Sequence, residues 1–267
     1  MAFGKPQKRF SQNFLTDQDI AVKIVGFLDL NKNDVVFEIG PGRGILTELI
    51  AATGARLVAF EIDRDLIESL SGKFAGYENV LIVNQDFLKV SPSEYHDGAF
   101  KLIGNIPYDI TSPVIGWMMQ YHQLIGRAVI TAQRELAERI AAGPGGKGWA
   151  PISIFSQCHF EIRKVMTISP KSFFPPPKIV SATLLFEPRQ DKPRVEHWDY
   201  FERTVRAAFQ QRRKLLANNL VRMGGPVKAD IVQILSEMGL AENVRAEQVT
   251  IEEFIQIGDR IRAVNIS

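Results

Sequence analysis

Short apolar runs alternate with amphipathic stretches throughout the first 190 residues of this 267-residue chain. The apolar runs have the length of buried strands, and the stretches between them have helical spacing. Alternation of this kind predicts an open, doubly wound α/β sheet with a binding crevice beyond the carboxyl ends of its strands. The expected strands are Val35–Gly40, Arg56–Asp63, Val80–Asp86, Phe100–Ile106 and Ala128–Gln133, and the expected helices are 44–52, 65–74, 112–122 and 134–141.

A change of pattern near Pro188–Pro193 predicts a second domain. Before it, two further strands, Ile162–Ile168 and Val180–Phe186, should include an antiparallel edge pair. The proline-rich segment that joins them should be a stiff surface loop carrying Phe173 and Phe174. The expected domains are therefore residues 1–190, built on the sheet, and residues 191–267, with helices at 198–223, 228–238 and 251–263.

Composition excludes several classes of protein. The single cysteine, Cys158, cannot form an internal disulfide, which fits a reducing compartment. No apolar run approaches about 18 residues, so we expect a cytoplasmic protein without a membrane segment. The four histidines are scattered without the spacing of a metal site, and neither Ser–His–Asp nor Cys–His catalysis has a supporting signature.

The first expected strand ends in a glycine-rich turn, Glu38–Gly44. Glycines at alternate positions let the backbone turn sharply and let a ligand approach it where a Cβ would stand. The spacing is G-x-G-x-G rather than the G-x-G-x-x-G of dinucleotide sites, which disfavours a nicotinamide oxidoreductase. Taken alone, such a cluster is more often only a tight turn.

Acidic residues end the next two expected strands. Glu61 stands 21 residues after Gly40, where a carboxylate can accept hydrogen bonds from both ribose hydroxyls of a nucleoside. Asp86 ends the third strand, in a position to receive an adenine amino group. Each acid alone can equally be a helix cap or a solvated loop residue. Together with the glycine turn, the three successive strand ends predict a nucleoside site.

The tetrapeptide from Asn105 to Tyr108 ends the fourth expected strand. An amine that attacks a methylsulfonium needs its lone pair free, and the Asn105 carboxamide oxygen and the Ile106 carbonyl can accept its two N–H bonds. Pro107 fixes the direction of that carbonyl, and the Tyr108 ring can stack on a base. For this segment taken alone, the alternative is an ordinary exit from a strand into a turn.

In this order, these residues resemble the S-adenosylmethionine-dependent amino-methyltransferases. Further segments narrow the resemblance to the rRNA adenine N6-dimethyltransferase family, closest to the branch that acts on small-subunit (16S) rRNA. The resemblance covers essentially the whole chain. The segments that carry it are Arg9–Leu15, Phe173–Lys178 with Ser181, Ala207–Leu215 and the closing helical domain.

The resemblance implies a Rossmann-like methyltransferase sheet that binds S-adenosylmethionine, followed by a small all-α domain that binds rRNA. It implies N6-dimethylation of two adjacent adenosines near the 3′ end of 16S rRNA during ribosome assembly, by an enzyme that we expect to be monomeric. Of the two aromatics in the proline loop, Phe174 is expected to complete the base sandwich. The implied cofactor-binding residues are Asn13, Leu15, Gly40, Glu61, Asp86 and Asn105, and the implied catalytic residues are Asn105, Pro107, Tyr108 and Phe174.

Two further functions remain open. A 23S rRNA adenine dimethylase that confers macrolide resistance shares the catalytic motifs, usually without so full a proline loop. A non-catalytic RNA-binding assembly factor can keep the fold with degenerate motifs, which the intact Gly40–Gly44 and Asn105–Tyr108 segments disfavour.

The formal net charge of +2 conceals a basic stretch at residues 203–222, which holds six Lys or Arg residues and no acid. A like-charged face suits a polyphosphate partner, and a merely solvated face is an equal alternative. Arg206 and Arg213 are seven residues apart and would align, with Arg203, on one stripe of a helix. We expect this stripe to contact rRNA phosphates.

Overall fold

The computed structural model describes residues 13–266, and the chain divides into two compact units. The first, called the sheet unit, comprises the described residues up to Ala141 together with His159–Pro188. The second, called the helical unit, comprises Ala142–Cys158 and the chain from Arg189 on. The expected domain boundary at residue 190 lies close to the end of the sheet unit, but Ala142–Cys158 belongs to the helical unit rather than to the sheet domain.

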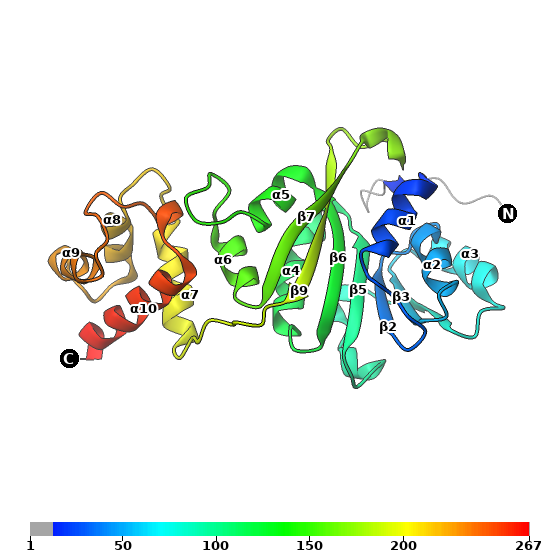
Figure 1. The fold of residues 1–267 in the computed structure, drawn as a ribbon, viewed down its shortest axis with the longest axis horizontal. Coiled ribbons are helices and arrows are strands. Elements are labelled where there is room, and N and C mark those ends of the chain that lie inside the picture. Colours follow the sequence, from blue (N-terminus) through cyan, green and yellow to red (C-terminus); the bar gives the residue numbers. More distant parts are fainter. Residues whose placement is uncertain (1–12, 267) are drawn as a thin grey trace. The chain divides into compact units, whose positions relative to one another are not determined.

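The sheet unit is built on seven strands, and it has the expected open α/β architecture (Figure 1). The strands that run from the first edge to the centre are parallel, whereas the last strand of the chain pairs antiparallel with both of its neighbours. The expected antiparallel edge pair is therefore confirmed. The order across the sheet is β4 (Val80–Asn84), β3 (Arg56–Glu61), β2 (Val35–Ile39), β5 (Phe100–Asn105), β6 (Ile125–Gln133), β9 (Ser181–Pro188) and β7 (Phe160–Ile168).

Helices cover both faces of the sheet because side chains alternate along the buried strands. Val36 faces the cluster that includes α1 (Gln18–Gly26) and α2 (Ile45–Ala51). Phe37, on the opposite face, contacts Phe60 with ring centroids 5.4 Å apart and stacks on Phe100. Phe100 in turn contacts Trp117 of α4 (Thr111–Gln120) on that face. The other helices of this unit are α3 (Arg64–Phe74), α5 (Arg134–Ile140) and short 3-10 turns at Phe87–Lys89, Pro92–Glu94, Tyr108–Ile110 and Pro170–Ser172.

A second, two-stranded sheet joins the start of the described chain to the proline-rich segment. β1 (Phe14–Leu15) pairs antiparallel with β8 (Phe173–Phe174), so that Phe14 lies opposite Phe174 and Leu15 opposite Phe173. The Thr16 N–H donates to the Ser172 carbonyl (2.9 Å) and extends the pairing. We call residues 13–16 and 172–174 the aromatic ribbon. The sequence predicts only a surface loop for its second half, because a two-residue strand has no periodicity of its own.

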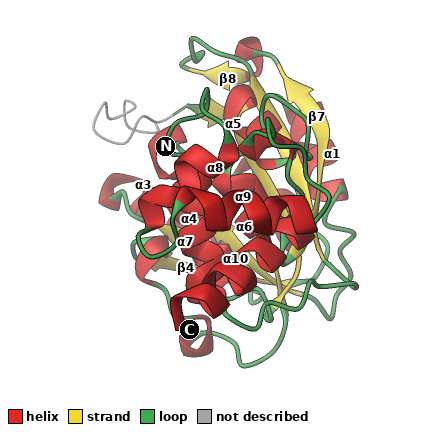
Figure 2. Ribbon diagram, turned by 90° about the vertical axis from the view of Figure 1, so that its left-hand side faces the viewer, coloured by secondary structure: helices red, strands yellow, loops and turns green. Residues whose placement is uncertain are grey.

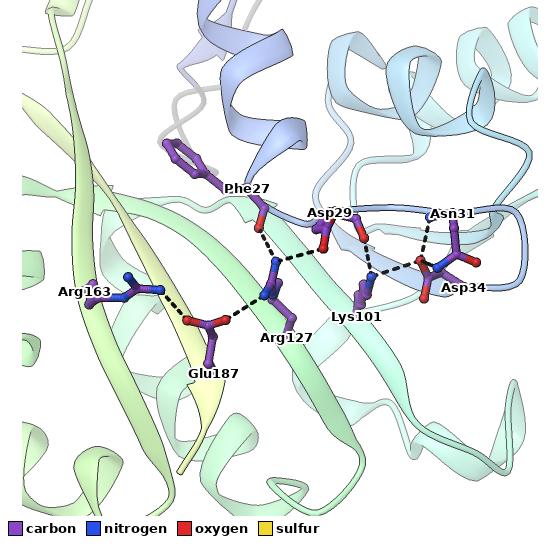
Figure 3. A network of polar contacts seen from close by, with 8 residues as sticks. All are labelled: Phe27, Asp29, Asn31, Asp34, Lys101, Arg127, Arg163 and Glu187. Carbon is purple, nitrogen blue, oxygen red and sulfur yellow. Dashed lines mark hydrogen bonds and ion pairs between the residues drawn. The ribbon is translucent and has the colours of Figure 1, made fainter. Parts of the chain in front are cut away.

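Charged side chains join the strands of the sheet near the amino ends of β5 and β6, away from the ends where a crevice is expected (Figure 3). Arg127 on β6 donates to Glu187 on β9 (2.6 Å), which also accepts from Arg163 on β7. Lys101 on β5 pairs with Asp34, just before β2 (2.9 Å). Asp29 joins the two groups, because its carboxylate lies 3.8 Å from Arg127 and its carbonyl accepts from Lys101 (2.6 Å). The network leaves the opposite ends of the strands for the site.

The helical unit contains the remaining helices, and residues 142–158 are packed into it (Figure 2). Trp149 is fully buried there, and its indole Nε1 donates to the Val249 carbonyl (2.8 Å). No helix in the described part of the chain is long and apolar enough to span a bilayer. The helices are α6 (Pro151–Gln157), α7 (Trp198–Ala208), α8 (Leu216–Leu220), α9 (Lys228–Glu237) and α10 (Ile251–Ile266), with 3-10 turns at Val221–Met223 and Ala246–Gln248.

The single helix expected over Trp198–Met223 is wrong, because the chain leaves the helix after Ala208 and resumes it only at Leu216. The buried Asn219 side chain donates through Nδ2 to the Ala208 carbonyl (2.7 Å) and the Gln211 carbonyl (3.1 Å). The first bond satisfies a carbonyl that the end of α7 leaves without a helical partner, and the second holds the turn that follows α7. The expected stripe of Arg203, Arg206 and Arg213 therefore does not form on one helix.

Candidate active site

A cavity of about 320 Å³ opens at the carboxyl ends of the parallel strands, as the alternating pattern predicts. Residues from the glycine turn, from the ends of β3, β4 and β5, and from the aromatic ribbon line its wall. The cavity brings together eight of the nine expected site residues: Asn13, Leu15, Gly40, Glu61, Asp86, Asn105, Pro107 and Tyr108. Phe174 is the exception.

The glycine turn is shaped by its conformation and by the ribbon above it. Gly40 has φ +62°, and a Cβ there would meet nothing within 4 Å, so its backbone faces open space beside the cavity. Gly42 has φ +59°, and a Cβ there would lie 2.9 Å from the Phe14 ring. Glycine at this second position therefore lets the aromatic ribbon pack directly on the turn.

Glu61 is buried at the end of β3, and its carboxylate bonds to the glycine turn. Its Oε2 accepts from the Gly42 N–H (3.2 Å), and its Oε1 accepts from the Asp63 N–H (2.9 Å). Burial raises the pKa of this carboxyl, and these backbone donors work in the opposite direction. A carboxylate has about four acceptor positions, so each oxygen can also accept from a ligand hydroxyl.

Glu38, the penultimate residue of β2, is a second buried acid in the cavity wall, and sequence reasoning gave it no role. Its Oε2 accepts from the Thr47 hydroxyl at the start of α2 (2.8 Å). Burial, with a smaller contribution from the charge of Glu61, raises the pKa of Glu38 to about 8. The wall thus holds two buried carboxyl groups that can exchange hydrogen bonds with a hydroxyl-bearing ligand.

Asp86 is half-buried, and its Oδ1 accepts from the Leu88 N–H (3.1 Å) as the cap of a short 3-10 turn. The capping interpretation therefore holds for one of its oxygens. Sequence reasoning missed the apolar neighbours of the two strand-end acids, Ile62 and Phe87, which also line the cavity. Ile62 is 48% exposed. Each strand-end acid is followed directly by an apolar residue. This pattern could have predicted apolar cavity walls that suit a flat ring.

Asn105 is oriented by the aromatic ribbon. Its Nδ2 donates to the backbone carbonyl of Asn13 (3.2 Å), which directs Oδ1 away from that carbonyl. The Ile106 N–H donates to the Thr131 carbonyl on β6 (3.2 Å), and Pro107 has φ −53°. These contacts hold the carboxamide and the turn that follows it in one arrangement.

Two aromatic side chains stand in the cavity wall beside Asn105. The Tyr108 hydroxyl lies 3.0 Å from the hydroxyl of the buried Ser181, which fixes the ring. Phe173 also lines the cavity and is buried, whereas Phe174 lies outside the wall and is 51% exposed. Phe173 and Phe174 are successive residues of β8, so their side chains point to opposite sides of the ribbon. The structure places Phe173 there, not Phe174 as expected.

The sequence matches the ribosomal RNA adenine dimethylase family over residues 4–263, nearly its whole length. The chain belongs to this family. It is 39% identical to the ribosomal RNA small subunit methyltransferase A of Syntrophotalea carbinolica, over 97% of each chain. It is 38% identical to the protein of the same name from Latilactobacillus sakei, over 96% of this chain and 89% of that one.

Solved structures related to this dimethylase agree with its fold. The 23S rRNA methyltransferase ErmE superposes with a TM-score of 0.74 at 27% identity, covering 94% of this chain and all of that one. A dimethyladenosine transferase from Plasmodium falciparum gives a TM-score of 0.78 at 24% identity, covering 91% of this chain and 95% of that one. The expected methyltransferase sheet with C-terminal helices is thereby confirmed.

S-adenosylmethionine is the cofactor that this dimethylase family implies, and the cavity fits it. The open space at Gly40 admits a ligand to the backbone, and the buried carboxyl groups of Glu38 and Glu61 can exchange hydrogen bonds with ribose hydroxyls. Ile62 and Phe87 offer apolar walls for an adenine ring. The residues that would hold the cofactor are the expected set of Asn13, Leu15, Gly40, Glu61, Asp86 and Asn105.

Glu61→Ala should weaken S-adenosylmethionine binding by about 1.5–3 kcal/mol, because it removes a charge-assisted hydrogen-bonding partner. Isothermal titration calorimetry measures the effect. The matched control is Glu68→Ala on the exposed side of α3, which should bind like the wild type. Tight binding of NADH by the wild type, with no measurable binding of S-adenosylmethionine, would overturn the cofactor assignment.

Proposed function

We propose that this dimethylase transfers methyl groups to the N6 atoms of two adjacent adenosines near the 3′ end of small-subunit (16S) rRNA, during assembly of the subunit. The observation that carries the proposal is the convergence of a nucleoside-binding wall and the Asn105–Tyr108 segment in one cavity. The choice of the small subunit rests on relatives with 36–39% identity that carry the name small subunit methyltransferase A. ErmE, a 23S rRNA methyltransferase, is only 27% identical.

The residues around Asn105 would position the amine that is methylated. When bound, S-adenosylmethionine supplies an electrophilic methyl group on its sulfonium. Asn105 Oδ1 and the Ile106 carbonyl would accept the two N–H bonds of the adenine amine, which leaves its lone pair aimed at the methyl group. Both acceptors stabilise the positive charge that develops on the nitrogen during transfer. The nitrogen can then release a proton to water, and its one remaining N–H can keep one of the two acceptors during the second transfer, which requires a fresh cofactor.

Tyr108 and Phe173 would hold the target base between them, with Phe173 taking the part first expected of Phe174. Both rings stand in the cavity wall, and base–aromatic stacking contributes about 1–3 kcal/mol per base. A base inside a duplex cannot reach such a cavity, so the target must be unpaired or turned outward.

The deciding experiment is incubation of the protein with labelled S-adenosylmethionine and unmethylated small or large ribosomal subunits, followed by mapping of the modified bases. We expect label only in small subunits, as dimethyladenosine at two adjacent positions. Label in large subunits would favour the macrolide-resistance alternative. Binding to subunits without any label would favour the non-catalytic assembly factor.

The helical unit is proposed to bind rRNA phosphates through Arg213, one of the three arginines first expected, together with Lys214. Arg206 pairs with Glu202 (2.7 Å), and Arg203 donates to the Met223 carbonyl (3.3 Å). Arg213 and Lys214 lie exposed in the turn between α7 and α8, and within residues 13–266 neither side chain has an ion-pair partner. These two cations are therefore the better candidates for phosphate contacts.

Replacing Arg213 and Lys214 together by Gln should flatten the plot of log affinity against log salt by about 1.5, since each lost phosphate contact changes the slope by roughly 0.7–0.9. Filter binding to small subunits over a salt series measures the slope. Arg206→Gln is the matched control and should change it little, because that guanidinium already pairs with Glu202. An unchanged slope in the double variant would mean that this turn is a solvated surface that contacts no phosphates.

A further inference from the structure

Phe174 is a large aromatic side chain that the structure leaves half in solvent, with 51% of its surface exposed. It is nevertheless firmly held. Its backbone pairs with Phe14 in the aromatic ribbon, and Pro175, Pro176 and Pro177 follow it directly. An exposed ring on a restrained backbone loses little conformational entropy when it binds a partner. Such a ring is suited to binding.

A cation from the cofactor turn lies against this ring. The guanidinium carbon of Arg43 is 5.5 Å from the centroid of Phe174 and 4.8 Å from that of Phe14. Both distances lie within the range of cation–π contacts. Arg43 also lines the cavity, so the Phe174 ring adjoins the edge of the cavity in which the target base is proposed to sit.

We infer that Phe174, backed by Arg43, is a stacking site for the unpaired nucleotide next to the target adenosine. The inference rests on the proposed function, because it assigns a second base position to the same substrate. Phe173 and Phe174 are adjacent residues whose side chains point to opposite sides of the ribbon, one into the cavity and one to its outside. Two adjacent bases of an RNA strand, one of them turned into the cavity, match that arrangement.

The chemistry of this position favours a nucleotide over an apolar partner. A purine offers a flat face to the Phe174 ring, and its phosphate is attracted to the Arg43 guanidinium beside it. Stacking on an aromatic ring is tolerant of sequence. The Phe174 position can therefore hold either one of the two adjacent adenosines while the other one is in the cavity. This suits an enzyme that modifies both.

The test uses a short unpaired RNA with 2-aminopurine beside one adenosine, together with S-adenosylhomocysteine so that no transfer occurs. Fluorescence of 2-aminopurine falls when the base stacks. We expect quenching with the wild-type protein and with Phe174→Tyr, which keeps the aromatic face. Phe174→Leu keeps the apolar bulk alone and should lose the quenching, with affinity reduced roughly 5- to 150-fold, the equivalent of about 1–3 kcal/mol.

Ile179→Ala is the matched control, since Ile179 is a 41% exposed apolar residue that follows the same proline run. It should quench and bind like the wild type. Quenching by Phe174→Leu equal to that of the wild type, or no quenching by the wild type, would overturn the inference. The proposed function fails separately, through absence of labelled transfer to small subunits by the wild-type protein, a result that does not depend on the fluorescence.

Discussion

Asn105→Ala should lower the turnover of methyl transfer by about 100- to 1,000-fold, the range typical of losing one positioned polar group that stabilises transition-state charge. The carboxamide oxygen is aimed at the amine because Nδ2 is held by the Asn13 carbonyl (3.2 Å). Its contact strengthens as charge develops on the nitrogen, so turnover should fall far more than RNA affinity. Single-turnover transfer to small subunits, compared with equilibrium binding, measures the two effects.

Asn105→Asp distinguishes the role of the acceptor oxygen from that of the amide donor. It keeps an acceptor oxygen and loses the donor to Asn13, so we expect a rate between those of the wild type and Asn105→Ala. Asn31→Ala, in the turn before β2, removes an exposed carboxamide that bonds only within this turn, to Asp34 and to the Asn33 N–H, and should leave turnover unchanged. Transfer by Asn105→Ala at the wild-type rate would mean that the reacting amine is held elsewhere.

The residues of the cavity wall could be predicted because they stand where parallel strands end. Gly40, Glu61, Asp86 and Asn105 are far apart in the sequence, but they stand at the ends of four parallel strands, three of them buried, whose carboxyl ends meet at one edge of the sheet. Buried strands have a clear apolar signature, and chain topology then dictates where their ends lie. Four polar or glycine residues thus converge without any knowledge of side-chain packing.

Other features depend on contacts between distant segments that leave no local pattern. The aromatic ribbon joins Phe14 to Phe174 through pairing of two-residue strands, and only that register decides which phenylalanine faces the cavity. The break after α7 is set by Asn219, whose side chain reaches back to the Ala208 carbonyl. Helical periodicity continues across such a break, because apolar spacing reports burial and not the path of the backbone.

The ionisation of Glu38 also depends on contacts between distant segments. Its position near the end of the first strand is visible in the sequence, whereas its burial beneath α2 and its proximity to Glu61 are not. Burial raises the pKa of this carboxyl from 4.5 to about 8. The folded protein therefore keeps a proton on Glu38 at pH values where the unfolded chain has released it. Through linkage, the free energy of unfolding must fall as the pH rises from about 4.5 to about 8. Above pH 8 this loss of stability is complete and stays constant.

Glu38→Gln should remove this pH-dependent loss of stability. Glutamine is uncharged, has nearly the same shape, and can still accept from the Thr47 hydroxyl that lies 2.8 Å from Glu38. Relative to the wild type, the variant should gain little at pH 4.5 and progressively more toward pH 8, reaching on the order of 3–5 kcal/mol in the free energy of unfolding. Urea unfolding followed by circular dichroism at a series of pH values measures the difference.

Glu161→Gln provides the matched control, since Glu161 is an exposed glutamate on β7 of the same unit. Its difference from the wild type should stay near zero across the series, because this substitution changes no buried group. A gain for Glu38→Gln that is already complete at pH 4.5 would show that packing, and not titration, stabilises the variant. A loss that grows with pH would mean that the folded protein holds Glu38 ionised, as a carboxylate that the wall of the cavity favours.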